Sequence, residues 1–194
     1  RYDGQITVVT ENGQVTAQND ELTISGSTDC YLYITAATDF KMEHPKYRTG
    51  ETTDQLYNRV KEMNEKARNK GYQKVRDDHI KDYKNIFDRV TLDLGQQPSR
   101  FETNEQLENY KSGSADPDQD RDLEFLLFQY GRYLTISSSR EDGILPSNLQ
   151  GVWNDLNTNV PWGSDYHINV NLQMNYWPNY VTNMAETAIP LIDF

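Results

Sequence analysis

The sequence predicts a mixed α and β fold in which β-strands come first and α-helices follow. Residues 1–40 are rich in β-branched and aromatic side chains, as in the run at residues 30–37. After residue 52, several long segments place apolar residues at helical spacing instead. Because the two patterns occupy different parts of the chain, we expect a β segment followed by a helical one.

Four strands are expected in the first segment, at residues 5–10, 15–17, 21–25 and 30–37. The Asn12-Gly13 pair predicts a hairpin turn between the first two strands. A sheet of this size has open edges and would be only marginally stable alone. It is therefore either a small β-meander domain or, as we favour, the C-terminal strands of a larger β-sandwich.

Residues 41–103 are predicted to form a helical linker, with helices over 53–69 and 72–89 and a short strand over 90–94. Gly71 stands where a helix-ending glycine belongs.

Residues 104–194 are predicted to carry helices over 105–111, 119–136 and 171–184, the last with Pro178 in its interior. The acidic run at 116–122 has Arg121 and Leu127 where a calcium-binding EF-hand needs Gly and Glu, so we interpret it as helix N-terminal charge.

Composition excludes several classes of function. The net charge is −11 over 194 residues and no basic stripe is present, so neither nucleic acid nor an anionic membrane surface is an expected partner. No apolar run approaches the roughly 18 residues of a membrane span. The histidines share no metal-ligand spacing and cofactor-binding motifs are missing, so we expect no metal and no cofactor. The single cysteine, Cys30, permits no internal disulfide.

The most informative segment is residues 166–177, where apolar residues alternate with an imidazole and amides. In an extended chain His167, Asn169 and Asn171 would share one side, and such a row of polar groups suits a sugar. The surrounding loop, predicted at 137–166, adds Trp153, Trp162 and further amides. The other amides are Asn148, Gln150, Asn154, Asn157, Asn159, Gln173 and Asn175. The alternative interpretation is that these amides cap turns and helix ends.

Glycoside hydrolysis normally needs two carboxyl groups, one acid and one base or nucleophile. Near the amides the sequence offers only Asp155, Asp165 and Glu186, and nothing in their spacing identifies a pair.

Three runs of the chain resemble glycoside hydrolase family 95, the inverting α-L-fucosidases, some of which prefer α-L-galactosides. They are GRYLTISSSR at 131–140, LPSNLQGVWN at 145–154 and PWGSDYHINVNLQMNYW at 161–177. Residues 77–83 and 87–95 resemble the linker of that family. The resemblance implies an N-terminal β-sandwich whose C-terminal strands are residues 1–40. It also implies a helical linker and an (α/α)6 barrel whose first part is residues 104–194.

In this resemblance Asn169 and Asn171 match an amide pair beside the catalytic water, and the matching His167 would contact the sugar. Residues Trp153, Asn154 and Trp162 would line the pocket. The family's general acid and water-activating Asp come from barrel segments downstream of the matched part, so we expect this chain alone to be inactive. The implied substrate is a fucosylated oligosaccharide, and the implied source is a secreted or periplasmic bacterial enzyme.

The sequence leads to one further expectation, self-association, and to two competing interpretations of the function. An incomplete barrel would expose apolar surface, so the chain is expected to self-associate. The competing interpretation is a carbohydrate-binding or interaction module without catalysis. A related glycoside phosphorylase would need basic residues for phosphate, and Arg140 is the only one found near residues 140–177.

Overall fold

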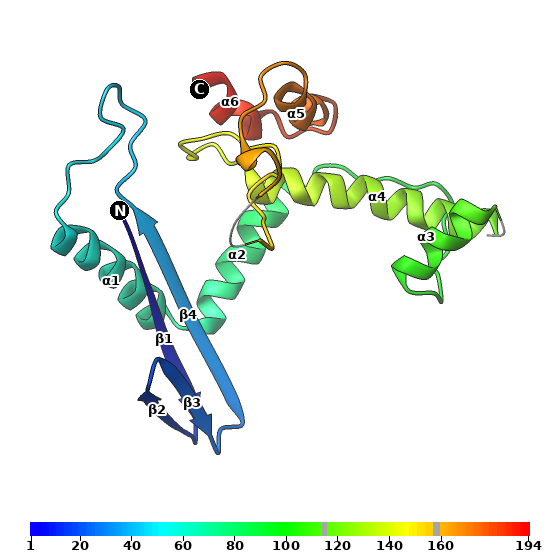
Figure 1. Cartoon of the computed structure of the whole chain (residues 1–194). Helices are drawn as coiled ribbons and strands as arrows, with labels where there is room; N and C mark the ends of the chain where they lie inside the picture. Colours follow the sequence, from blue (N-terminus) through cyan, green and yellow to red (C-terminus); the bar gives the residue numbers. More distant parts are fainter. Residues whose placement is uncertain (114–115, 157–159) are drawn as a thin grey trace. The chain divides into compact units, whose positions relative to one another are not determined.

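The computed structural model describes residues 1–113, 116–156 and 160–194 of the chain. The chain forms two compact units, Arg1–Lys81 and Asp82–Phe194. Both units are drawn in Figure 1, and each is considered by itself below. The mixed α and β class expected from the sequence is confirmed, with antiparallel strands in the first unit and helices in both.

The first unit contains two antiparallel strand pairs. Strand β1 (Tyr2–Glu11) pairs along its whole length with β4 (Asp29–Thr38), and β2 (Gln14–Gln18) pairs with β3 (Glu21–Ser25). The hairpin predicted at Asn12-Gly13 is therefore wrong, because β1 and β2 are not partners.

The hairpin turn lies one strand later, at Asn19 and Asp20. Both residues have positive φ, 51° and 63°, as the tight turn of a two-residue hairpin requires. At the predicted site Asn12 alone is left-handed, with a φ of 55°, and Gly13 is not. A type I′ turn needs both central residues in that region, so the Asn-Gly pair does not form one.

Helix α1 (Thr53–Lys70) packs on one face of the β1–β4 pair, as Figure 1 shows. The buried Asn64 connects the two. Its Oδ1 accepts a hydrogen bond from the Thr7 hydroxyl at 2.5 Å, and its Nδ2 donates to the Tyr33 carbonyl at 2.8 Å. The opposite face of the strand pair exposes four large apolar residues: Tyr2, Ile6, Leu32 and Ile34.

Both ends of α1 follow local sequence signals. Thr52 and Gln55 form a reciprocal capping box at the N-terminus, each side chain accepting from the other's backbone N–H. Gly71, at a φ of 80°, ends the helix and donates to carbonyls of its last turn, as predicted. Helix α2 (Tyr72–Phe87) follows immediately.

The second unit places α3 (Thr103–Ser112) against α4 (Pro117–Ser138). Asp116 is the N-cap of α4 and accepts from the Asp118 N–H at 2.9 Å, which confirms the acidic run as helix N-terminal charge. The strand predicted at 90–94 does not form, and these residues are irregular. A strand needs a ladder partner, and no described strand lies in this unit to supply one.

The core of the second unit joins the end of α2 to the C-terminal part of α4 and to Met184. Ile86, Ile136 and Met184 form its apolar centre. Arg132 is only 2% exposed, yet its guanidinium donates to the carbonyls of Ile86, Phe87 and Val90. The positive charge thus caps the C-terminal end of α2, where the helix dipole is negative.

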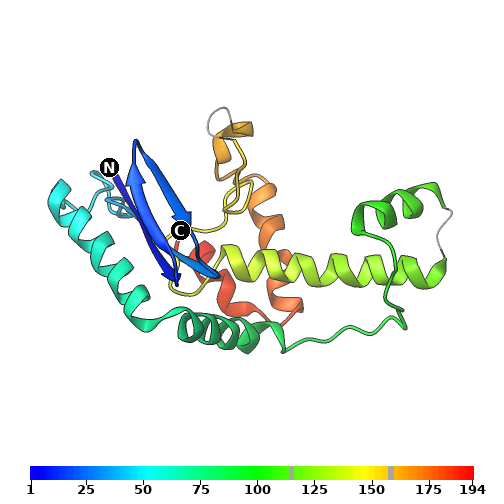
Figure 2. The ribbon, with the colours of Figure 1, turned by 90° about the horizontal axis from the view of Figure 1, so that it is seen from below.

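The chain ends with α5 (Asn171–Val181), a 3-10 turn (Ala185–Ala188) and α6 (Ile189–Asp193). In Figure 2 these orange and red segments lie beside α4, with which α5 is in contact. Leu172, Tyr176 and Ala188 form a second apolar cluster beneath α5. No helix in the described parts of the chain is long and apolar enough to cross a membrane.

Candidate functional site

The long loop between α4 and α5 is held together by hydrogen bonds between its own segments. A tight turn joins Asn148 and Gly151, with backbone N–H···O distances of 3.0 and 2.9 Å. The Leu149 N–H then donates to the Asp165 carbonyl at 3.0 Å, and the Gln150 side chain donates to Pro161 at 3.1 Å. These hydrogen bonds fix residues 161–165 against residues 148–151, and the two segments together are called the platform below.

His167 stands on this platform beside an acid and an aromatic ring. Its Nδ1 lies 3.1 Å from Oδ2 of Asp165. The ring of Trp162 meets the imidazole edge-on, with centroids 6.0 Å apart, and the indole is 75% exposed. The carboxylate orients the imidazole, which leaves Nε2 available to a ligand. Sequence reasoning selected all three residues, and the structure brings them together.

The helix predicted from residue 171 is confirmed, and the extended conformation that would place His167, Asn169 and Asn171 on one side is not found. Residues 168–170 form a turn, closed by a bond from the Leu172 N–H to the His167 carbonyl at 3.0 Å, and α5 begins at Asn171. The reason is the helical spacing of Leu172, Tyr176 and Asn179, which are all buried. Burying this face stabilises a helix, and it outweighs the two-residue alternation of the amides.

The amides of the segment divide into two groups. Five of them hold the local structure together through side-chain hydrogen bonds: Asn148, Gln150, Asn154, Gln173 and Asn175. Asn169 and Asn171 are exposed, and their side chains form no hydrogen bond with any other described residue. Asn157 and Asn159 lie outside the described residues. The turn-capping interpretation thus accounts for the first group and leaves Asn169 and Asn171 available to a ligand.

Trp153 and Asn154 are placed differently from each other. Trp153 lines a cavity of about 330 Å³ together with Leu134, Ser147, Gly151 and Asn175, among others. The side chain of Asn154 is used within its own turn, where Oδ1 accepts from the Leu156 N–H at 3.0 Å. Trp153 therefore faces a cavity, and Asn154 holds a turn of the loop.

Gly151 determines where the Trp153 ring lies. Its φ is +72°, and a Cβ atom there would lie 2.9 Å from the ring atoms Cε3 and Cζ3 of Trp153. A real Cβ atom essentially never comes this close to a ring carbon, so any larger residue would displace the indole. This role of Gly151 was missed from the sequence, although a glycine just before a loop tryptophan is a usable signal of close approach.

A buried polar network holds α5 against the platform. The Tyr176 hydroxyl accepts from the Ser147 N–H at 2.7 Å and lies 2.8 Å from Oγ of Ser139. That Oγ donates to the Thr187 carbonyl at 2.7 Å, so Tyr176 supplies the proton of the Ser139 contact. The network fixes the helix that begins with Asn171. Sequence reasoning missed it, because two serines and a tyrosine at such separations form no motif.

Two titratable groups near the amides, Glu186 and Tyr166, have a pKa shifted by their surroundings. Burial by itself would raise the pKa of Glu186, but a backbone hydrogen bond and the guanidinium of Arg89, 2.5 Å away, keep that pKa below its usual range. Burial and the neighbouring Tyr176 raise the pKa of Tyr166, which stays protonated at neutral pH. No group of three or more metal-ligating side chains occurs among the described residues. The arrangement is suited to binding and orienting neutral, hydroxyl-rich groups.

Comparison with known proteins supports a carbohydrate-active assignment. The family model of the glycosyl hydrolase family 95 catalytic domain matches residues 71–194. Probable alpha-fucosidase A of Aspergillus oryzae is 38% identical over 162 residues, covering 82% of this chain and 21% of that protein. Probable alpha-fucosidase A of Aspergillus niger is 33% identical over 198 residues, covering 98% of the chain and 24% of that protein.

A plant protein is also similar. Alpha-L-fucosidase 2 of Arabidopsis thaliana is 46% identical over 121 residues, or 60% of this chain and 14% of that protein. The chain thus spans no more than about a quarter of the length of these relatives. Because they are fungal and plant proteins, they do not support the bacterial source expected from the resemblance.

Proposed function

The chain belongs to glycosyl hydrolase family 95, and we propose that it is part of an enzyme that removes terminal α-L-fucose from oligosaccharides. In this proposal Asn169 and Asn171 hold the water that attacks the sugar with inversion. The relatives named as alpha-fucosidases support the choice of sugar, and α-L-galactose, which shares the ring configuration, is the second candidate substrate.

One observation carries the proposed role of the amides. In a segment whose other described amides are engaged in turns, the side chains of Asn169 and Asn171 alone remain exposed and unbonded within the described structure. A carboxamide carbonyl accepts a hydrogen bond from water, and its NH₂ group donates to a carboxylate. The pair can therefore orient a water molecule while a carboxylate from another part of the enzyme activates it.

The neighbouring residues would bind the sugar. His167, oriented by Asp165, offers Nε2 to a hydroxyl group, and the exposed ring of Trp162 offers an apolar surface to a sugar face. Trp153 lines a neighbouring cavity whose lining includes none of His167, Trp162, Asn169 and Asn171, and we propose that it and Asn154 shape the loop around the sugar. We place the general acid and the activating Asp in parts of the enzyme outside this chain.

The proposed architecture is a β-sandwich, a helical linker and an (α/α)6 barrel, with boundaries near residues 40 and 103. Its support is two exposed apolar surfaces. The first is the β1–β4 face described above, which a second sheet would cover. The second is a cavity of about 550 Å³ between α3 and α4, lined by Leu107, Leu123, Leu126, Leu127 and others, which further helices would cover.

The test is Asn171→Ala in the full-length enzyme with a fucosyl-lactose substrate. We expect turnover to fall by about 10²- to 10⁴-fold, the usual contribution of a group that assists proton transfer. Substrate affinity should change little, because the water is used only in the transition state. The matched control is Asn104→Ala, an exposed asparagine of α3. Equal losses in turnover and binding would contradict the role, and binding without any turnover by the wild-type enzyme would favour a carbohydrate-binding module.

A further inference from the structure

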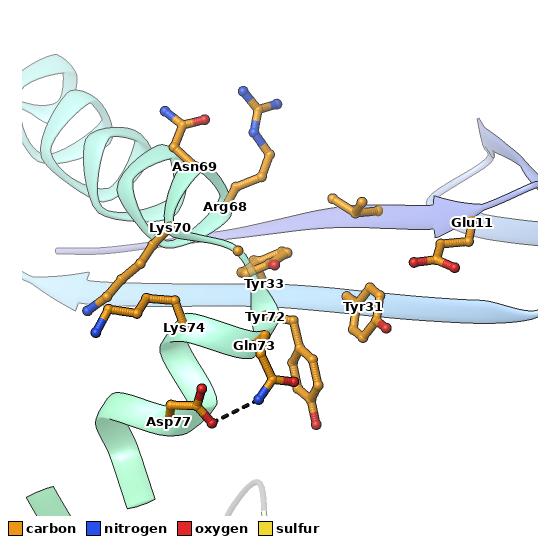
Figure 3. A pocket seen from close by; sticks show the side chains of 12 residues that line it. Glu11, Tyr31, Tyr33, Arg68, Asn69, Lys70, Tyr72, Gln73, Lys74 and Asp77 are labelled. Atoms are coloured by element: carbon orange, nitrogen blue, oxygen red, sulfur yellow. Dashed lines mark hydrogen bonds between the residues drawn. The ribbon is translucent and has the colours of Figure 1, made fainter. Parts of the chain in front are cut away.

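A second candidate site lies in the first unit, where α1 ends and α2 begins beside the β1–β4 pair. It is a cavity of about 830 Å³, within the roughly 300–1,000 Å³ range of ligand sites. Figure 3 shows its side chains coming from four elements: Glu11 of β1, two tyrosines of β4, the last turn of α1 and the first turns of α2. Nothing in the sequence analysis pointed to it, because its residues are far apart in the chain.

Tyrosines form the apolar part of the wall. Tyr31 and Tyr72 stack with ring centroids 4.7 Å apart and an interplanar angle of 27°. The stack joins β4 to the first residue of α2, so the ring of Tyr72 is held in place although 48% of that residue is exposed. Tyr33 lies two residues from Tyr31 on the same strand face and also lines the cavity. Rings held in this way offer a rigid surface to the apolar face of a sugar.

The charges of the site are nearly balanced, which favours a neutral ligand. Three cationic side chains line the cavity, namely Arg68, Lys70 and Lys74, together with two carboxylates, Glu11 and Asp77. The adjoining Asp78 binds both lysines, and their hydrogen bonds lower the pKa of that carboxyl to about 2. A phosphate or sulfate site would present several unpaired cations. Of the three lining cations, Arg68 alone has no carboxylate partner among the described residues.

Several polar groups of the wall are available to a ligand. Gln73 is engaged, since its Nε2 donates to Asp77 at 2.8 Å (Figure 3). The side chains of Arg68, Asn69 and Glu11 form no hydrogen bond or ion pair with any described residue. Guanidinium, amide and carboxylate together supply donors and acceptors, the combination that hydroxyl groups require. Aromatic rings, largely paired charges and mixed hydrogen-bonding groups are therefore found in one cavity.

We propose that this cavity is a second carbohydrate-binding site, which holds a neutral oligosaccharide through Tyr72, Arg68 and Asn69. The choice of an oligosaccharide over other neutral polar ligands rests on the proposed function. A second site of this kind would add to the affinity of the enzyme for oligosaccharides.

The proposal is tested by titrating the 194-residue chain with 2′-fucosyllactose and with unfucosylated lactose. Two-dimensional NMR would follow the Gly71 backbone amide and the side-chain NH₂ groups of Asn69 and Gln73. Saturable shifts of these signals are expected with at least one sugar. Tyr72→Ala should weaken this binding about tenfold, the value of one lost aromatic contact. The matched control is Tyr57→Ala, a tyrosine of α1 with a similar exposed fraction, 47%, that lies outside the cavity.

Each outcome of the titration either supports or overturns the second binding site. No shift at these signals with either sugar, or equal affinity of the Tyr72→Ala and wild-type chains, would overturn the proposal. A second variant, Asn69→Ala, guards against a folding defect of the first, since Asn69 is exposed in the last turn of α1. Fucosidase activity of the full-length enzyme is measured separately. Binding here without that activity would refute the proposed function alone, and activity without binding here would refute only the second site.

Discussion

Removing one oxygen atom from Tyr176 should loosen the helix that carries Asn171. In Tyr176→Phe the ring stays in the core, where the residue is 4% exposed, so the apolar contribution is kept. The hydroxyl is lost, and with it the acceptor of the Ser147 N–H at 2.7 Å and the donor to Ser139 at 2.8 Å. The Ser147 N–H is then buried without a partner, which costs about 1–3 kcal/mol.

The appropriate assay is hydrogen exchange, because the loss is local. If exchange proceeds through opening of α5 and the platform, 1–3 kcal/mol corresponds to about 5- to 150-fold faster exchange. We expect this acceleration in peptides covering residues 139–151 and 171–181. The first unit should be unaffected. Tyr180→Phe is the matched control, since Tyr180 lies on the same helix, is 61% exposed and has no hydrogen-bond partner for its hydroxyl among the described residues.

Two results would refute the reasoning. Exchange in Tyr176→Phe that matches the Tyr180→Phe control would mean that the hydroxyl does not hold the platform to the helix. Acceleration spread evenly over both units would mean that the substitution acts on global stability, so that the network has no special relation to the segment bearing Asn171.

Three other predictions follow from the same structure. Asn64→Ala should destabilise the first unit by about 1–3 kcal/mol, because Asn64 satisfies buried groups of the sheet; urea denaturation compared with Asn58→Ala, an exposed position on the same helix, measures this. Gly151→Ala should displace the Trp153 ring, observed as a shift in tryptophan emission, and unchanged emission would contradict the predicted contact. Because the pKa of Glu186 is lowered in the folded state, its ion pair should contribute stability above its ordinary value of 4.5, and this contribution should be lost as the pH falls through the lower folded value. Glu186→Gln should flatten the stability profile across that range, and a profile parallel to the wild type would count against the pairing.

Local signals in the sequence predicted most helices well. Gly71 was predicted as the end of α1 and is its C-cap, and the acidic residues before α4 marked its start. These signals succeed because a helix is stabilised by contacts within a few residues. Strand pairing depends instead on residues distant in the chain, which is why the partner of β1 was predicted incorrectly. The absent strand at 90–94 has the same origin, since its residues favour strands but find no ladder to join.

For the candidate sites too, contacts between residues close in the sequence could be predicted, and contacts between distant residues could not. The proximity of Trp162, Asp165 and His167 could be predicted because they lie within six residues. The helix from residue 171 was predicted, but the alternation of polar residues wrongly suggested that His167, Asn169 and Asn171 share one side of an extended chain. The cavity in the first unit was beyond sequence reasoning. Its tyrosines meet only because β4 and the α1–α2 junction pack together, and no local pattern encodes that approach.

The separation of the amides into engaged and free groups has a consequence for how this segment can evolve. Leu172, Tyr176 and Asn179 are fixed by the core, so most substitutions there would lower stability. Asn169 and Asn171 are exposed and form no side-chain hydrogen bond with any described residue, so substitutions there should cost the fold little. A library randomised at these two positions should therefore yield mostly folded variants. Specificity could be altered there without first adding stabilising mutations elsewhere, an uncommon advantage for residues this close to a proposed reaction centre.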